Sequence, residues 1–284
     1  GMQCILVLSG VGLEDTNRIL LLESPGLCGV STELTTFSPM QNEQLPNQDG
    51  IYEQYTMGFP DRGVAKAGYT ICWGADPGTR TDFSVTVGDF TLLGPNVRDM
   101  TCSMGVACQI GLTGLSLNSA NRLIVLLAGN CGDNQPIRLN LQGMLNSISV
   151  EASAPYDTYL LGTAVAGVPG SFKVCWAHAP GTNGGPNLYR VPVGMLTVRG
   201  PIQEAQRCTL STNCWVRLTG TELNASNRIL IIVSPSSCGD ASPVVADFPG
   251  ITNPQSPVAA NASTLGLYEL GAASAAPDGV GISY

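Results

Sequence analysis

Cysteine dominates the chemistry that is available to this chain. The sequence holds ten cysteines and one histidine, and it contains no Cys-x-x-Cys pair. Zinc sites and thioredoxin-like redox motifs depend on spacings that are missing here. An even number of cysteines favours disulfides that form in an oxidising compartment, so we predict an extracellular or cell-surface protein. The residues predicted to be disulfide-bonded are Cys4, Cys28, Cys72, Cys102, Cys108, Cys131, Cys175, Cys208, Cys214 and Cys238.

Catalytic residues are not grouped anywhere in the sequence. As a general base, His178 would need a nucleophile and an orienting partner, and its counterpart in the preceding repeat is Ala75. The glycine motifs of phosphate-binding loops and of serine hydrolases do not occur. The acids are scattered, although spacing alone leaves a carboxylate pair for glycoside cleavage open. We therefore predict that the chain is not an enzyme and that His178 is an ordinary loop residue.

Calcium is the minor alternative to a chain without cofactors. Asp76 and Asp82 flank one loop, and Asp133 and Asp240 each follow a Cys-Gly pair. Oxygen-lined calcium sites often lie between extracellular modules, but no dense Asp-x-Asp-x-Asp run occurs here. We therefore expect no cofactor other than attached carbohydrate.

Two kinds of residue suggest carbohydrate, either attached to the chain or bound by it. Asn224 and Asn261 each begin an Asn-Ala-Ser triplet, which is an acceptor for N-glycosylation in a secreted protein. Trp73 and Trp176 each follow a cysteine and could form aromatic platforms for sugars. Packing of each tryptophan on a disulfide in the core is the alternative that the immunoglobulin pattern favours.

The overall composition predicts strands and excludes two classes of partner. The 284 residues are 44% hydrophobic and 12% charged, with 34 Gly and 19 Pro between runs of Val, Ile, Leu and Thr. That balance is typical of an all-β protein with many turns. The net charge of −8 and the lack of a Lys/Arg cluster argue against nucleic acid. The apolar runs have the length of strands, so we expect no membrane insertion.

One segment recurs three times and shows that the chain is a repeat. It reads LEDTNRILLL from Leu13, LNSANRLIVL from Leu117 and LNASNRILII from Leu223. Cys4, Cys108 and Cys214 stand 104 and 106 residues apart, so the period is about 105 residues. Such a period is the size of an independent domain rather than of a solenoid unit. Other elements with the same spacing are Asn17-Arg18, Asn121-Arg122 and Asn227-Arg228, then Cys28-Gly29, Cys131-Gly132 and Cys238-Gly239.

The repeats predict three immunoglobulin-like β-sandwich modules in tandem. Short apolar segments separated by turn signals about every ten residues favour sandwiches of about seven strands. We place the first module at residues 1–97, the second at 98–203 and the third at 204–284. The Gly-Pro pairs at 94–95 and 200–201 mark module ends, because proline stops a strand. The third module is incomplete, because Tyr284 corresponds to Tyr69 of the first. We expect a continuing or neighbouring chain to supply the missing strands.

The repeat also favours one disulfide pattern. Pairing across similar loops uses all ten cysteines and gives Cys4–Cys28, Cys108–Cys131, Cys214–Cys238, Cys72–Cys102 and Cys175–Cys208. Loops of about 25 to 35 residues would each contribute about 3 kcal/mol by the chain-entropy estimate. The alternative pairs Cys102–Cys108 and Cys208–Cys214 leave Cys4 without a partner, and spacing alone leaves both patterns open.

A family resemblance rests on two segments of the repeat. Tyr69–Pro95 and Phe172–Pro201 share the pattern Y-x-V/I-C-W…F/Y-x-V-x-V-G-x-L/F-T-V/L-x-G-P, with Phe172 in the first place of the second. The pattern and the cysteines around it resemble repeat modules of secreted or surface proteins of algae and protists. The chain also looks like protomers of extracellular glycosylated fibrils. The resemblance covers essentially the whole chain, which departs from it by lacking part of the third copy.

The resemblance implies a structural role outside the cell. We expect the protomer of an extracellular fibril or surface filament, in which disulfide-stabilised copies of the chain assemble head-to-tail into a homopolymer. An adhesion or carbohydrate-binding ectodomain is the alternative, and a secreted enzyme is the weakest of the three hypotheses.

Overall fold

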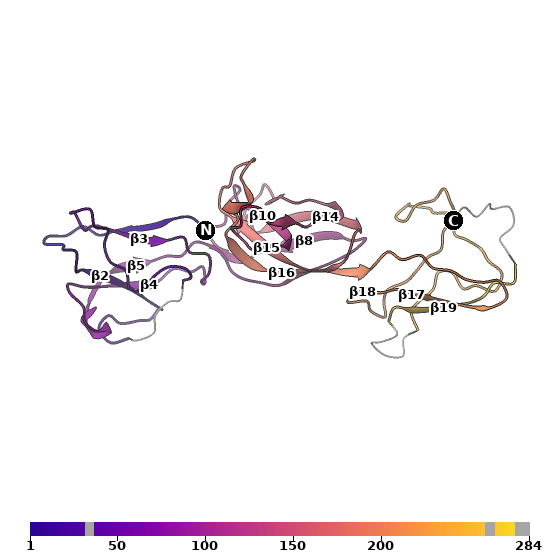
Figure 1. The fold of residues 1–284 in the computed structure, drawn as a ribbon, viewed down its shortest axis with the longest axis horizontal. Helices are drawn as coiled ribbons and strands as arrows, with labels where there is room; N and C mark the ends of the chain where they lie inside the picture. The colour runs from indigo at the N-terminus through magenta and orange to yellow at the C-terminus, as the bar shows by residue number, and fades with distance from the viewer. Residues whose placement is uncertain (32–36, 259–264, 276–284) are drawn as a thin grey trace.

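The computed structural model describes residues 1–31, 37–258 and 265–275, and it consists almost entirely of short β-strands. Three β-rich units lie in a row along the long axis of the molecule (Figure 1). They correspond to the three modules of the repeat. Two short 3₁₀ turns, η1 (Arg80–Asp82) and η2 (Pro186–Leu188), lie in the loops before the last strands of the first and second modules.

The second module has two sheets packed face to face. The larger sheet has the order β11 (Ile137–Arg138), β10 (Arg122–Ala128), β15 (Gly170–Ala177), β16 (Val191–Pro201) and β7 (Met100–Ser103). The smaller sheet has the order β12 (Gln142–Met144), β14 (Thr158–Ala166) and β8 (Ala107–Gly111), and β13 (Ile148–Ser149) adds to β10. Strand β7 runs parallel to β16, and the other pairs are antiparallel. This connectivity is that of an immunoglobulin-type sandwich.

The first module repeats the centre of that arrangement. Strand β1 (Cys4–Val7) pairs with β3 (Gln54–Gly58), as β8 pairs with β14. The opposite sheet consists of β2 (Arg18–Leu22), β4 (Tyr69–Gly74) and β5 (Val85–Phe90), in the order of β10, β15 and β16. The all-β, immunoglobulin-like class predicted from the sequence is therefore confirmed.

The third module has one of the two sheets in regular form. Strand β17 (Asn213–Arg217) pairs with β19 (Leu267–Ala272), which matches β8 with β14. The counterpart of β10 is the segment 228–233, and among the described residues it forms only isolated bridges, from Ile229 to Gln255 and from Ile232 to Val245. Leu230, in the middle of that segment, is 43% exposed.

The strand that follows each Asn-Arg pair is buried on both faces when a Cys-Trp strand lies beside it. In β10, Leu123 and Val125 face the sandwich core, whereas Ile124 and Leu126 pack outside the sheet around Cys131, Cys175 and Tyr189. This double burial explains why the sequence is a continuous apolar run rather than an alternating one. In β2 the outer face is covered in the same way by Cys28, Cys72 and Phe83.

The disulfides differ from the predicted pattern. The structure pairs Cys28–Cys72, Cys102–Cys108, Cys131–Cys175 and Cys208–Cys214, and it leaves Cys4 and Cys238 as free thiols. The predicted Cys4–Cys28, Cys108–Cys131, Cys214–Cys238, Cys72–Cys102 and Cys175–Cys208 bridges are therefore wrong, as is the prediction that all ten cysteines are bonded.

The reason for the difference is the direction in which the cysteines point. Cys108 lies in the sandwich core, whereas Cys131 lies in the cluster on the outer face of β10. A bridge between them would have to cross the sheet. Cys131 instead reaches Cys175 on the adjacent β15, and Cys108 reaches Cys102 on β7 within the core.

Two asparagines in each module support this framework. Asn17, Asn121 and Asn227 each accept a hydrogen bond at 2.8 Å from the backbone N–H three residues earlier, which closes the turn before the apolar strand. Asn42, Asn146 and Asn253 instead bond both backbone groups in the middle of the apolar strand, at distances between 2.7 and 3.0 Å.

The arginines after the turn asparagines do not share a contact. Arg18 pairs with the Glu43 carboxylate at 3.4 Å, whereas Arg122 donates to the backbone carbonyls of Ser119 and Asn121. The asparagine therefore carries the repeated contact of the Asn-Arg pair, and the arginine does not.

Candidate functional site at the junctions between modules

His178 takes part in a turn contact that the modules share. Its Nδ1 lies 3.2 Å from Nδ2 of Asn121, the buried asparagine that closes the turn before β10. In the first module the equivalent Asn17 donates through Nδ2 to the carbonyl of Ala75 at 2.8 Å. The imidazole of His178 therefore takes the place of a backbone acceptor in the same turn contact.

Three of the four acids considered for calcium, Asp82, Asp133 and Asp240, instead bind nearby backbone N–H groups. The Asp82 carboxylate accepts hydrogen bonds from Thr79 and Gly78, and the bond from Thr79 lowers the pKa of Asp82. Asp133 and Asp240 each accept a bond of 2.7 Å from the backbone N–H three residues earlier. Within the described ranges, no group of three or more His, Cys, Asp or Glu is placed to hold a metal ion.

The two glycosylation candidates differ in what can be said of them. Asn224 is exposed and lies in the turn before residues 228–233, where its side-chain oxygen accepts a bond from the Ser226 N–H at 3.0 Å. Asn261 lies outside the described residues. Glycosylation at both positions remains a prediction from the acceptor triplets.

Consecutive modules meet through the same backbone ladder at two junctions. At the first junction, β6 (Gly94–Pro95) pairs with β9 (Gly114–Leu115) of the second module. At the second junction, the Gly200–Pro201 end of β16 pairs with β18 (Gly220–Thr221) of the third module. The residue after each proline donates its N–H at 2.7 Å, from Asn96 to Thr113 and from Ile202 to Thr219.

Glycine is required on the receiving side of both junctions. A Cβ on Gly114 would collide with the carbonyl oxygen of Gly94 and come within 2.8 Å of the Pro95 Cα. Gly220 has the same two conflicts, with Gly200 and Pro201. The close approach of two backbones therefore explains these glycines, which otherwise stand in a strand-like sequence.

The linker after the first junction continues along the second module. The Arg98 N–H donates to the Val193 carbonyl at 2.8 Å, and the Asp99 carboxylate accepts from the Met195 N–H at 2.9 Å. Strand β7 then pairs along β16 and is fixed by the Cys102–Cys108 bridge. Val193 is fully buried beneath this connection. The second module thus uses residues 94–103 to complete its own edge.

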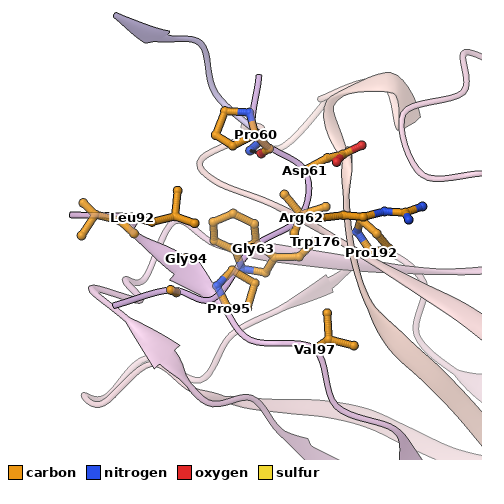
Figure 2. Close-up of a pocket in the computed structure, with 14 residues that line it drawn as sticks. Pro60, Asp61, Arg62, Gly63, Leu92, Gly94, Pro95, Val97, Trp176 and Pro192 are labelled. Carbon is orange, nitrogen blue, oxygen red and sulfur yellow. Dashed lines mark hydrogen bonds between the residues drawn. The ribbon is translucent and has the colours of Figure 1, made fainter. Parts of the chain in front are cut away.

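The pocket at the first junction is nearly filled. It encloses about 40 Å³ between Pro60–Gly63 and Leu92–Pro95 of the first module and Trp176 and Pro192 of the second (Figure 2). Sites for small organic ligands typically have volumes of about 300 to 1,000 Å³. Trp176 is only 4% exposed and belongs to the sandwich core, so it is not a platform for sugars. The junction is therefore built to hold two modules together.

Side chains add different contacts to the two junctions. At the first, the Arg190 guanidinium lies 4.4 Å from the ring centre of Phe59 in the preceding module. At the second, Arg199 forms an ion pair with Glu222 across the modules. The backbone ladder is common to both junctions, whereas the charged contacts are not.

Sequence reasoning identified the Gly-Pro pairs only as module ends, and it missed the glycines that receive them. Gly10, Gly114 and Gly220 share the register of the repeat, and each lies six residues after the cysteine that aligns the modules. That spacing was the available signal. Asn146 and Asn253, which bond the backbone of the apolar strand, follow segments of low similarity between the modules, so the repeat did not indicate them.

Comparison with known proteins assigns no family. No protein-family model and no curated protein matches the chain. Among solved structures, an ICAM-5 D1–D4 ectodomain fragment is similar over 96% of this chain and 72% of its own length, at 13% identity and a TM-score of 0.20. A TM-score this low carries no argument, so the immunoglobulin-type fold is assigned from the strand order given above. None of the described residues forms a helix long and apolar enough to cross a membrane.

Proposed function

We propose that this chain is a structural protomer of an extracellular fibril or surface filament, assembling head-to-tail with copies of itself. The observation that carries the proposal is the repeated junction. Both junctions use a Gly-Pro strand end, a receiving glycine and the same N–H donor after the proline. A contact of this kind joins unlike ends of consecutive modules, and repetition of it extends a filament without closing a ring.

The disulfides support an extracellular setting. Each bridge lies within one module or fixes the strand that enters it. Such bridges persist in oxidising compartments and are rare in the cytosol. A glycan at Asn224 would add solubility beside the second junction to a chain with only 12% charged residues.

Exposed apolar residues at the outer modules support assembly. Val7 and Val11 of the first module are 62% and 103% exposed, and Leu230 and Val245 of the third are 43% and 44% exposed. An open strand edge with apolar side chains is a surface to which another strand adds.

Size-exclusion chromatography with negative-stain imaging tests the proposed function. The oxidised, glycosylated protein should elute as a broad distribution of large species and appear as unbranched filaments. A monodisperse monomer over the micromolar range, at physiological salt, would contradict the proposal. Intact-mass measurement on the same sample would establish the attached sugars.

A further inference from the structure

Strand β8 of the second module uses one of its two backbone edges and leaves the other open. The Leu112 N–H donates to the Asp157 carbonyl at 2.8 Å, so the backbone groups of residues 108, 110 and 112 face β14. Those of residues 107, 109 and 111 face the opposite way. Within the described ranges, β14 is the only strand that pairs with β8. We call the outward-facing backbone of residues 107–111 the open edge.

The open edge continues a contact that is already established. Thr113 follows in the same alternation, and its carbonyl accepts a bond from the Asn96 N–H at 2.7 Å. Strand β9 then pairs with β6 of the first module. After Asn96 the linker crosses to β16 in the opposite sheet. The edge that runs along residues 107–115 is therefore occupied by the junction at its C-terminal end and open at its N-terminal end.

The third module shows that backbone groups at this place accept a partner. Arg217 is the counterpart of Gly111, and the Gln206 side chain bonds its N–H at 3.4 Å and its carbonyl at 3.2 Å. The sheet of β17 and β19 also carries two charges, on Arg217 and Glu269. Covering groups and charged side chains are two of the devices that keep edge strands from pairing with other chains.

The second module has neither device on its small sheet. Strands β8, β12 and β14 contain no Asp, Glu, Lys, Arg or Pro. The side chains of the open edge are Ala107, Gln109 and Gly111, which are exposed, and a Cβ on Gly111 would meet nothing within 4 Å. Leu160, opposite Gln109 on β14, is 48% exposed. The open edge is thus uncharged and accessible, as is typical of an edge to which a strand adds.

The same strand of a second copy fits this edge. An antiparallel partner must present backbone groups at every second residue, and β8 does so over residues 107–111 without disturbing Thr113. A two-fold rotation about Gln109 places Gln109 opposite Gln109 and Ala107 opposite Gly111, so small side chains flank the central pair. The net charge of −8 opposes most contacts between copies, whereas this sheet is neutral.

We propose that the open edge of β8 pairs with the open edge of β8 in a second copy, antiparallel and about a two-fold axis. The two three-stranded sheets then become one continuous sheet. Such a contact uses the same surface on both partners and closes on itself as a pair. It lies on the side of the second module, so in a filament it joins two filaments laterally. The inference goes beyond the proposed function and does not depend on it.

Opposite charges at position 109 test the two-fold register. Two copies of Gln109→Lys, or two of Gln109→Glu, would place like charges directly opposite, whereas a mixture would place Lys opposite Glu. Immobilised full-length Gln109→Lys should therefore capture at least about fivefold more Gln109→Glu than Gln109→Lys at micromolar concentration. Equal capture of the two would overturn the proposal.

Gln142 supplies the matched control. It is exposed on β12, at the other edge of the same sheet. Gln142→Lys and Gln142→Glu change the net charge as the variants at position 109 do, so general attraction between copies contributes equally to both pairs. The Gln142 pair should show no preference above about twofold. A preference as large as that at position 109 would mean that net charge drives the capture and would overturn the open edge.

Hydrogen exchange of the unmodified full-length protein tests the backbone part of the proposal. The N–H groups of Gln109 and Gly111 should exchange at least about fivefold more slowly when the protein concentration is raised through the range in which capture occurs. The N–H of Ile110, which faces β14, should be unaffected. Concentration-independent exchange at Gln109 and Gly111 would contradict the proposal, even in a protein that forms single filaments. Pairing by a protein that forms no filaments would support the open edge and contradict the proposed function.

Discussion

The apolar segment that follows the Asn-Arg pair is buried in the second module but half-exposed in the third. In β10, Ile124 is fully buried beneath the Cys131–Cys175 bridge, with β15 beside it. In the segment 228–233, the corresponding Leu230 is 43% exposed, and its pairing with the rest of the described chain is limited to isolated bridges. The repeated segment therefore specifies an interior strand, but a neighbouring Cys-Trp strand is needed to make it one. A continuous apolar run is typical of a strand that neighbouring strands and side chains cover on both faces, so whether it is buried depends on those neighbours as well as on its own sequence.

Removing the bridge over β10 should have the largest effect, because it makes the second module resemble the third. The chain-entropy estimate gives about 4 kcal/mol for the bridge of Cys131 and Cys175, whose separation is 44 residues. The double replacement Cys131→Ala/Cys175→Ala should lower the free energy of unfolding of this module by that amount. Denaturant titration followed at Trp176, with the other two tryptophans replaced by phenylalanine, measures the loss.

The short bridge is the control for that measurement. Cys102→Ala/Cys108→Ala opens a loop of six residues, and the same estimate gives about 2 kcal/mol.

The number of free thiols tests the disulfide pattern itself. Thiol titration of the unfolded, unreduced protein should find two thiols per chain before any replacement, namely Cys4 and Cys238. A count of zero free thiols would mean that all ten cysteines are bonded, as predicted from the sequence, and would contradict the pairing on which the comparison of the two modules depends.

Truncation of one side chain in each module should show the next largest difference. Ile124→Ala removes a fully buried side chain that cannot be replaced by water, and it should cost about 3 kcal/mol. Leu230→Ala at the equivalent position should cost less than about 1 kcal/mol, because much of that side chain is already hydrated. Trp176 and Trp215 report unfolding of the two modules separately. Equal losses would mean that the third module buries this segment in solution.

The fold was largely predictable because its signals are local. The repeat, the turn residues and the continuous apolar runs after Asn17 and Asn121 gave the modules and their all-β class. The disulfides were not predictable, because pairing depends on the face of the sheet to which each cysteine points. Cys108 and Cys131 are close in sequence but lie on opposite sides of β10.

The junction was only half predictable for a similar reason. Proline has no N–H to donate to a strand ladder, so the Gly-Pro pairs indicated where modules end. The receiving side is defined by how closely a second backbone approaches Gly114 and Gly220, and that approach exists only once two modules are in contact. The sequence signal for this approach was a glycine, Gly114 or Gly220, in a segment that does not otherwise look like a turn.

Replacing the asparagine that bonds the backbone of the apolar strand should lower stability moderately, and more in the second module than in the third. Asn146 bonds both backbone groups of Val125, which is buried, and the Leu139 carbonyl. Asn146→Ala leaves these groups without partners and should cost about 2 kcal/mol. Asn253→Ala should cost less than about 1 kcal/mol, because water can reach the half-buried Ile231 that it bonds. Hydrogen exchange at Val125 and Ile231 checks both, and faster exchange only at Ile231 would contradict the expectation.

The ion pair at the second junction should have the smallest effect. Arg199 and Glu222 have side chains that are 41% and 50% exposed, and their counterparts at the first junction are Leu93 and Ser116. A double-mutant cycle with Arg199→Leu and Glu222→Ser should give a coupling energy of about 0.5 kcal/mol, vanishing at high salt. Ser suits the test because Ser116 and Glu222 both have positive φ, 56° and 47°, so the replacement leaves the backbone unchanged.

The size of this coupling decides what holds consecutive modules together. If the backbone ladder does so, both junctions should have similar strength, and exchanging the charged pair for the uncharged one should leave unfolding at Trp215 almost unchanged. A coupling of about 2 kcal/mol or more would mean that side-chain charge fixes the second junction and that the two junctions are different contacts. The repeated register of Gly94–Pro95 and Gly200–Pro201 favours the first result, because the backbone pairing is the part that both junctions share.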